Sequence, residues 1–439
     1  MEQLPRKLGL LDATLIVIGI VIGSGIFLLP NVIARSLPSG FAIIAVWVVA
    51  GILSYFGALA YAELGAMIPA TGGQYVYLRD AFGPLWGFLG GWVITLATVP
   101  GGTAFLAVGF SIYLDHFVRL TPWMRQAVSL TLVAVLSAAN YIGIQEGAWI
   151  QRIFTTLKIA GLALVISAAA FAPHVSTTHV AAAMTRPISY GGFGLAMTAC
   201  LMAYNGWSYV SFVAGEVRDP QRNLPRALAL GMVAVMALYV CANLAYMNVM
   251  TVPEIAATER VGAEAAGRAL GPAGATVLST VVLLSIIGAI NGCILTGARI
   301  PFAEARDGVF FSRFGRIHPR FKTPAFAIVA QGLWTEVLIL TGSYESLFAY
   351  SILSAWIFYT LSVLAVWVLR RKAPDAPRPY KMWGYPFTLW AFVIVSVWFM
   401  ADALANQFKT SLMALAITAA GVPFYLICRS REGREPPLS

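Results

Sequence analysis

The chain has 439 residues, of which 59% are hydrophobic and only 11% are charged, and its mean hydropathy is +0.78. Soluble domains carry about 25% charged residues, so this composition excludes a soluble globular protein and indicates a chain solvated by lipid. The net charge of +10 raises the question of a nucleic-acid partner.

Apolar runs long enough to span a bilayer recur along the whole chain. A membrane-spanning helix needs about 20 apolar residues, whereas a membrane β-barrel shows alternating patterning, which is absent here. The sequence therefore predicts an all-α membrane protein with twelve transmembrane helices and no soluble domain. The predicted spans are residues 11–34, 40–67, 84–117, 124–143, 150–172, 190–215, 225–251, 272–300, 323–342, 346–370, 385–403 and 410–428.

The basic residues are distributed unevenly between the predicted loops. If the N-terminus is cytoplasmic, most of the 29 Lys and Arg fall on the cytoplasmic side. Cytoplasmic loops are enriched in Lys and Arg, so this pattern places both termini in the cytoplasm and explains the positive charge without a polyanion. We therefore expect no nucleic-acid partner, and we expect residues 429–439 to form a short cytoplasmic tail.

The first predicted span contains glycines where a membrane helix would normally be regular. Gly19, Gly23, Ser24 and Gly25 lie near its centre, in the stretch IGIVIGSGIF. A glycine costs roughly 1 kcal/mol relative to alanine in a helix interior. The spacing of Gly19 and Gly23 is typical of close helix packing, but the cluster also favours a helix that unwinds at this depth. This span alone leaves both interpretations open.

The sixth predicted span is interrupted in the same way. Asn205, Gly206 and Ser208 lie in mid-membrane, in the stretch LMAYNGWSY. Paired interruptions in corresponding halves of a chain are typical of transporters built from inverted repeats, with the substrate site at the breaks. Spans one and six are five apart, so we predict one domain over 1–439 with a five-plus-five inverted repeat. Its parts are the repeats 8–172 and 190–370, and two accessory helices in 385–428.

Broken backbone of this kind suits a zwitterionic substrate. The half-helix that begins at Ser24 and Gly25 presents unpaired N–H groups and a positive dipole end, which attract a carboxylate. The half-helix that ends near Val21 presents unpaired carbonyls, which attract an ammonium, and the sixth span adds further carbonyls. The predicted ligand is an amino acid. The predicted substrate-binding residues are Val21, Gly23, Ser24, Gly25, Met202, Ala203 and Asn205.

Four segments, taken together and in this order, resemble one transporter family. They are GSGIF at 23–27, Glu63-Leu-Gly with PATGGQY at 69–75, AYNGWSY at 203–209 with GEVRDPQRNLPR at 215–226, and AING at 289–292 with Arg299. The set is similar to the amino acid–polyamine–organocation (APC) transporters, especially their L-amino acid transporter branch. The resemblance implies a LeuT-type fold with broken helices 1 and 6, and transport of L-amino acids by alternating access.

Two positions near the expected pocket depart from the pattern of that family. Family members for large neutral amino acids often carry an aromatic gate where this chain has Met202, and many members have Gly or Ser where it has Asn205. The bulkier Asn205 would shrink the pocket or add a polar contact. We therefore expect small or polar neutral substrates, such as alanine, serine, glycine and threonine, with Met202 and Trp356 as gates.

Lys158 lies inside the fifth predicted span. A charge at that depth is a functional hypothesis by default, although a lysine near a span end also extends its ammonium to the interface. Several members of the resembled family carry a lysine here, where sodium-coupled relatives hold a cation. The resemblance implies that Lys158 bonds the Gly23 region and Ser285, and that it replaces sodium or carries a proton. Glu63, near the cytoplasmic end of the second span, is expected to be structural and to bond loop amides.

Other classes of function lack support in the sequence. The four histidines fall in predicted loops without a paired-ligand pattern, and no P-loop is present, so we expect no enzyme, catalytic residue, metal or cofactor. A channel would need rings of pore-lining charge. Two alternatives stay open: an amino acid sensor on the same fold, and a carrier of cationic amino acids or amines. The second would need an acidic residue beside the pocket, and the middles of the relevant spans offer none.

The cysteines bear on partners and location. All four lie in predicted spans, so none is available to an external disulfide; they are Cys200, Cys241, Cys293 and Cys428. Some eukaryotic members of the resembled family attach to a single-span glycoprotein through a cysteine in the loop between helices 3 and 4. The corresponding loop 113–122 has no cysteine. We therefore expect no disulfide-linked heavy subunit, and a multi-pass location in a prokaryotic inner (plasma) membrane.

Overall fold

The computed structural model describes residues 4–23, 25–172, 190–258 and 260–432. Within these ranges the regular backbone is helical and contains no β-strand. An isolated parallel β-bridge pairs Leu8 with Val217. The all-α class predicted from the sequence is therefore confirmed for the described chain.

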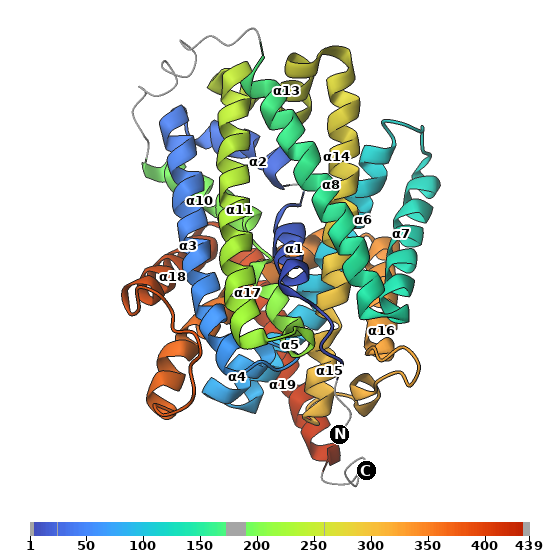
Figure 1. The fold of residues 1–439 in the computed structure, drawn as a ribbon, viewed down its shortest axis with the longest axis vertical. Coiled ribbons are helices and arrows are strands. Elements are labelled where there is room, and N and C mark those ends of the chain that lie inside the picture. The colour runs from blue at the N-terminus through green and yellow to red at the C-terminus, as the bar shows by residue number, and fades with distance from the viewer. Residues whose placement is uncertain (1–3, 24, 173–189, 259, 433–439) are drawn as a thin grey trace.

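The first part of the chain forms α1 to α8, and α3 and α8 run roughly along the long axis of the molecule (Figure 1). The elements are α1 (Leu10–Val21), α2 (Gly25–Ser36), α3 (Gly40–Met67), α4 (Gln74–Phe82), α5 (Pro84–Val93), the π-helical turn η1 (Ile94–Thr98), α6 (Val99–Leu114), α7 (Pro122–Ile142) and α8 (Ile144–Ala170).

The second part contains the remaining helices, and α11 and α14 run roughly parallel to α3 and α8 (Figure 1). The elements are α10 (Tyr190–Ala203), the 3₁₀ helix η2 (Trp207–Glu216), α11 (Pro220–Val249), α12 (Val252–Ala257), α13 (Val261–Leu270), η3 (Gly271–Ala273), α14 (Gly274–Gly297), α15 (Arg299–Arg306), η4 (Ser312–Gly315), α16 (Ala325–Thr341), α17 (Tyr344–Lys372), α18 (Phe387–Asn406) and α19 (Phe408–Glu432).

Eight helical segments of the described chain are long and apolar enough to cross a membrane, and α1 and α16 are apolar but shorter. Ten of the twelve predicted spans overlap these segments. The other two, 124–143 and 190–215, overlap α7 and α10 with η2, and the count of twelve crossings stays a prediction. Some boundaries differ from the predicted ones. α11 begins at Pro220 rather than at 225, because proline is well suited to the first turn of a helix. The π-helical turn η1 interrupts the third span without a signal in the hydropathy pattern.

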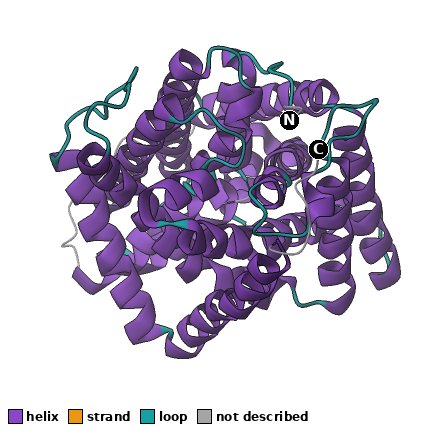
Figure 2. Ribbon diagram, turned by 90° about the horizontal axis from the view of Figure 1, so that it is seen from below, coloured by secondary structure: helices purple, strands orange, loops and turns teal. Residues whose placement is uncertain are grey.

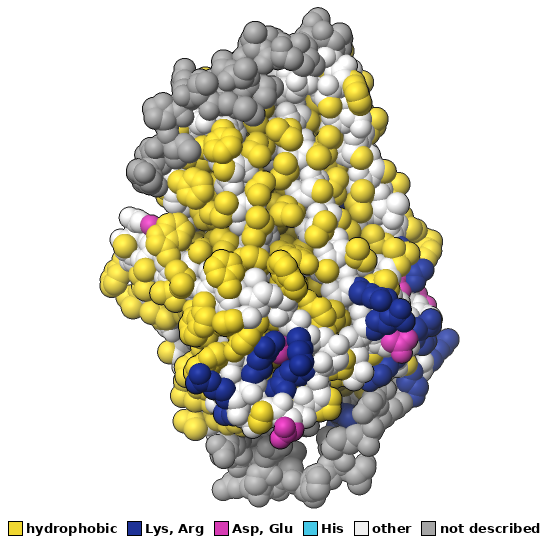
Figure 3. All heavy atoms as spheres, turned by 60° about the vertical axis from the view of Figure 1, so that its left-hand side comes forward, with side chains coloured by type: hydrophobic (Ala, Val, Ile, Leu, Met, Phe, Trp, Pro, Cys, Tyr) yellow, Lys and Arg dark blue, Asp and Glu magenta, His cyan; other side chains and the backbone are white. Residues whose placement is uncertain are grey.

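The surface separates apolar from basic side chains. Hydrophobic side chains cover most of the face in Figure 3, and Lys and Arg gather towards its lower end. This end, which carries α4 and α15 in Figure 1, is here called the basic end. Viewed from below, the helices pack around one another as a bundle with loops across the near face (Figure 2). Charge at bilayer depth is costly, so this separation is what a membrane-spanning bundle requires.

The short helix α1 lies in the interior of the bundle. It packs against α8, α11, α14 and η2, and every residue from Leu15 to Val21 is buried. A helix that is apolar all round is stable only where it is surrounded by protein or lipid. The end of α1 is therefore enclosed by four other elements, and these elements supply the side chains of the site.

Candidate functional site

Two helices are interrupted at the positions that the sequence predicts. α1 ends at Val21 and α2 begins at Gly25, while α10 ends at Ala203 and η2 begins at Trp207. Each interruption leaves carbonyls at one helix end and N–H groups at the next without intrahelical partners. Ser24 lies outside the described residues, so its part in the site stays a prediction.

The two breaks lie against each other. Gly206 has a φ of +110°, a left-handed conformation that favours glycine, and a β-carbon there would lie 2.6 Å from Ile20 Cγ2. A β-carbon at Gly25 would lie 3.5 Å from the Cα of Ala203. The backbone of one break thus approaches the other closely, and added bulk at position 206 would push the two apart.

The glycines of the first break have different roles. A β-carbon at Gly19 would collide with the side chains of Gln151 and Thr155 on α8, so Gly19 allows α1 and α8 to pack closely. At Gly23 a β-carbon would meet nothing within 4 Å. Helix packing therefore accounts for Gly19 but not for Gly23, which lies in the break itself.

Tyr239 of α11 links the two breaks. Its hydroxyl lies 2.9 Å from the carbonyl oxygen of Val21 and 3.2 Å from that of Ala203, and its ring is fully buried. The Val21 oxygen also accepts from the backbone N–H of Gly23 at 2.8 Å, whereas the Ala203 oxygen has no second donor among the described loop and side-chain hydrogen bonds and keeps capacity for one. The sequence analysis missed this residue, although a tyrosine in mid-span signals a hydroxyl that needs a buried partner.

Lys158 of α8 reaches the break in the first span. Its ammonium donates to the carbonyl oxygens of Gly19 at 2.7 Å and Ile22 at 2.5 Å, and the side chain is fully buried. The Ser285 hydroxyl of α14 donates to the same Ile22 oxygen at 3.0 Å. Lys158 and Ser285 thus meet at a shared acceptor rather than bonding each other. The ammonium points into the bundle and does not extend to an interface.

A polar stripe on α8 extends this contact along α1. Gln151 Nε2 donates to the carbonyl oxygen of Leu15 at 3.3 Å, and the Thr155 hydroxyl lies 3.4 Å from the same oxygen. Arg152, the residue after Gln151, forms an ion pair with Asp12 of α1. The spacing of 151, 155 and 158 on one helix face was a signal that sequence reasoning missed.

Buried amides hold this stripe from the other side. Asn291 of α14 donates to Gln151 Oε1 and to the carbonyl oxygen of Gly147, both at 2.9 Å. Asn140 of α7 donates to Asn291 Oδ1 at 2.9 Å. The network holds Gln151 against α1, because the Gln151 amide is hydrogen-bonded at both its nitrogen and its oxygen.

The remaining predicted site residues have distinct environments. Asn205 lies in the second break, and its Oδ1 accepts a hydrogen bond from the Tyr359 hydroxyl at 2.8 Å. The side chain of Met202 is exposed. Trp356 is buried, with its ring 6.1 Å from Tyr359 and 4.7 Å from Phe399 of α18. Tyr359 therefore connects the second break to the pair of packed rings Trp356 and Phe399, here called the Trp356 cluster. The gating roles of Met202 and Trp356 stay predictions.

A buried ion pair closes the basic end below the breaks. Arg299 Nε lies 2.7 Å from Glu216 Oε1, and both side chains are at most 1% exposed. The backbone oxygen of Glu216 accepts from the N–H groups of Lys7 and Leu8, and the Leu8 carbonyl accepts from the N–H of Arg218. The segment that precedes α1 is thereby attached to the end of η2.

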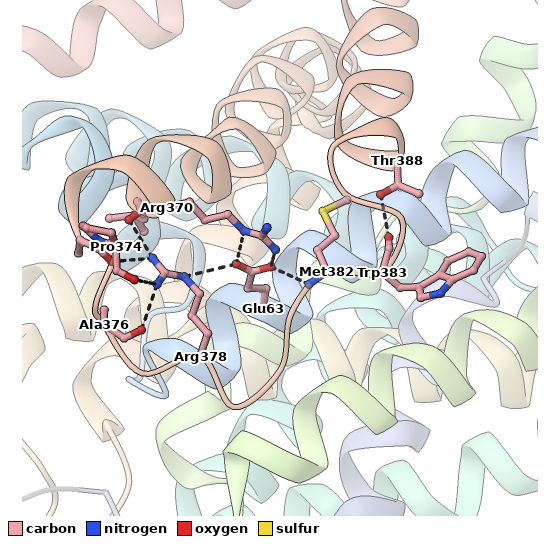
Figure 4. A network of polar contacts seen from close by, with 10 residues as sticks. Glu63, Arg370, Pro374, Ala376, Arg378, Met382, Trp383 and Thr388 are labelled. Atoms are coloured by element: carbon pink, nitrogen blue, oxygen red, sulfur yellow. Dashed lines mark hydrogen bonds and ion pairs between the residues drawn. The ribbon is translucent and has the colours of Figure 1, made fainter.

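Glu63 organises the connection between α17 and α18. It accepts two hydrogen bonds from Arg370, at 2.9 and 2.6 Å, and one from the backbone N–H of Met382 at 2.6 Å (Figure 4). Arg378 lies on its other side, with Nε 3.7 Å from Oε1. The expectation that Glu63 is structural and bonds loop amides is confirmed.

The chain is similar to known proteins over most of its length. The sequence profile of the family described as "Amino acid permease" matches residues 8–422. The chain is 32% identical to the serine/threonine exchanger SteT of Bacillus subtilis (strain 168), over 98% of both proteins. It is 32% identical to the human b(0,+)-type amino acid transporter 1, over 87% of this chain and 79% of that protein. It is 33% identical to the mouse large neutral amino acids transporter small subunit 2, over 97% and 81%.

Proposed function

Because this chain belongs to the amino acid permease family, we propose that it exchanges small neutral L-amino acids across the plasma membrane by alternating access and without sodium. The family is one of transporters and not of enzymes. A relative over 98% of its length is named a serine/threonine exchanger, which supports both the size of the substrate and the exchange mode.

One observation carries the sodium independence. The buried ammonium of Lys158 donates to the carbonyl oxygens of Gly19 and Ile22 at the C-terminal end of α1, where carbonyls lack partners within the helix. Carbonyl oxygens at a helix C-terminal end are ligands for a cation in transporters of this kind. A tethered ammonium with the Ser285 hydroxyl beside it satisfies the same acceptors, so we propose that no metal cation is needed there.

The breaks supply the groups that an amino acid needs. We assign the substrate carboxylate to the N–H groups of Ser24 and Gly25 at the start of α2, where the helix dipole favours an anion. We assign the substrate ammonium to the end of α1 at Val21 and to the Ala203 oxygen, beside the Tyr239 hydroxyl; of these two oxygens, that of Ala203 keeps a lone pair without a described donor. The exposed side chain of Met202 and the Trp356 cluster are the proposed gates.

The proposal includes an architecture and an orientation. The interrupted α1–α2 and α10–η2 pairs support a LeuT-type arrangement of twelve spans with inverted repeats. The gathering of Lys and Arg at one end supports cytoplasmic termini in a prokaryotic inner membrane. We further propose that the carrier works without a disulfide-linked heavy subunit, since none of its cysteines lies in the loop 113–122.

The test is transport by the purified protein in liposomes. Uptake of labelled alanine, leucine and arginine is measured with and without internal amino acid, sodium and a proton gradient. We expect alanine uptake that requires internal amino acid and is unchanged when sodium is removed. Uptake into empty liposomes driven by a proton gradient would indicate that the protein is a proton symporter and not an exchanger. Transport of arginine alone would contradict the neutral pocket, and no transport of any of the three would favour a sensor.

A further inference from the structure

The Asn205 side chain is held in one orientation. The Tyr359 hydroxyl of α17 donates to its Oδ1 at 2.8 Å, across the interface between the second break and the bundle. The Asn205 amide nitrogen makes no hydrogen bond with any residue that the structure describes, and the residue is only partly buried. The amide oxygen of Asn205 is thus paired, and its N–H donors are left without a described partner.

The Tyr359 ring is itself fixed in place. Its centroid lies 5.7 Å from that of Trp207 and 6.1 Å from that of Trp356. The Ser208 hydroxyl lies 3.4 Å from the tyrosine oxygen, and Tyr359 is only 4% exposed. A buried ring in contact with two indoles has little freedom to move, so the hydroxyl that orients Asn205 is held by packing.

An oriented donor at this place discriminates between substrate side chains. Asn205 is two residues from Ala203, whose carbonyl is proposed to receive the substrate ammonium, so the amide lies beside the substrate side chain rather than its carboxylate. A site built to hydrogen-bond a substrate hydroxyl rejects an analogue that lacks it, because the donor of the site is then left unpaired. A freely rotating amide would instead present its oxygen or nitrogen equally and lose this preference.

We propose that Tyr359 is a positioning residue that turns the Asn205 amide so that its N–H selects amino acids with a side-chain hydroxyl, serine and threonine, over alanine and 2-aminobutyrate. This inference rests on the proposed function and adds its specificity determinant. One hydrogen bond corresponds to a preference of about tenfold in the ratio of maximal rate to KM.

The experiment is exchange by purified carrier in liposomes, with serine against alanine and threonine against 2-aminobutyrate as paired external substrates. The variants are Tyr359→Phe, Asn205→Gly and the double variant. Tyr246→Phe is the matched control, because the Tyr246 hydroxyl is buried without a hydrogen-bond partner in the described chain. Size-exclusion profiles and melting temperatures verify that each variant is folded.

We expect the wild type and Tyr246→Phe to prefer the hydroxylated substrate of each pair by about tenfold. Tyr359→Phe and Asn205→Gly should each bring the ratio close to one, and the double variant should add no further loss. A wild-type ratio near one, or an unchanged ratio in folded Tyr359→Phe, would overturn the inference while leaving amino acid exchange intact. A wild type that exchanges none of the four substrates would overturn the proposed function instead.

Discussion

At the break in the first span, the Ile22 carbonyl oxygen accepts from both the Lys158 ammonium and the Ser285 hydroxyl. An unpaired carbonyl buried at this depth would cost about 1–3 kcal/mol. The two side chains come from α8 and α14, so satisfying one acceptor also joins three elements. Tyr239 does the same for the Val21 and Ala203 carbonyls, from a third direction.

Removing the Tyr239 hydroxyl should loosen the link between the breaks. Tyr239→Phe leaves the ring in place but removes the donor to Val21 and Ala203, at an expected cost of about 1–2 kcal/mol in stability. We expect a lower melting temperature in detergent and a several-fold slower exchange rate. Tyr246→Phe, which removes a buried hydroxyl without a described partner, should change neither. Equal effects of the two variants would show that the hydroxyl does not link the breaks.

At the scale of elements, α1 and α8 form one unit. The contact runs from the Asp12–Arg152 ion pair through Leu15 to the two carbonyls that bind Lys158. It depends on close approach, because the side chains of Gln151 and Thr155 occupy the space in which a β-carbon of Gly19 would lie. The amide network through Asn291 keeps Gln151 from moving aside.

Two glycine variants distinguish a glycine needed for close helix packing from a glycine that lies in the helix break. Gly19→Ala should overpack the α1–α8 contact and destabilise the protein by about 1–3 kcal/mol. A β-carbon added at Gly23 has no described atom within 4 Å, so the melting temperature of Gly23→Ala should match that of the wild type. Thermal unfolding in detergent measures both. A Gly19→Ala protein as stable as the wild type would show that the side chains of Gln151 and Thr155 can move to make room for the added methyl group.

The broken spans were the most predictable elements, and their partners were the least predictable. Gly23 and Gly25 in the first span and Gly206 in the sixth indicate a break, because glycine destabilises the interior of a regular helix. Lys158 was identified because charge is rare in a span. Tyr239 and Tyr359 were missed, since an aromatic residue in a span is ordinary and only three-dimensional packing decides what its hydroxyl meets. The π-helical turn η1 depends on packing in the same way.

At the scale of the whole molecule, one buried ion pair closes the basic end. Glu216 and Arg299 join η2 to α15, and the backbone of Glu216 also holds the segment that precedes α1. Three parts of the chain that are far apart in sequence therefore meet at one residue, Glu216. The two breaks, one between α1 and α2 and one between α10 and η2, are separate from this ion pair.

Breaking this pair should unfold the basic end rather than weaken it slightly. Arg299→Leu leaves the Glu216 carboxylate buried without its partner, at an expected cost of about 3–5 kcal/mol. Arg268→Leu is the matched control: it removes an arginine from partly exposed ion pairs with Glu254 and Glu264, at a cost below about 1 kcal/mol. Denaturation in detergent compares the two, and similar losses would mean that the buried pair contributes no more than a surface one.

The central claim is that the Lys158 ammonium replaces a bound cation at the break. Its most direct test is the rate of alanine exchange by wild type and Lys158→Met, each measured in sodium-containing and in sodium-free buffer. We predict equal wild-type rates in both buffers and a loss of tenfold or more in folded Lys158→Met, because the Gly19 carbonyl then lacks the ammonium donor and the Ile22 carbonyl keeps only the Ser285 hydroxyl. A wild-type rate that falls when sodium is removed, or a folded Lys158→Met that exchanges normally, would contradict the claim.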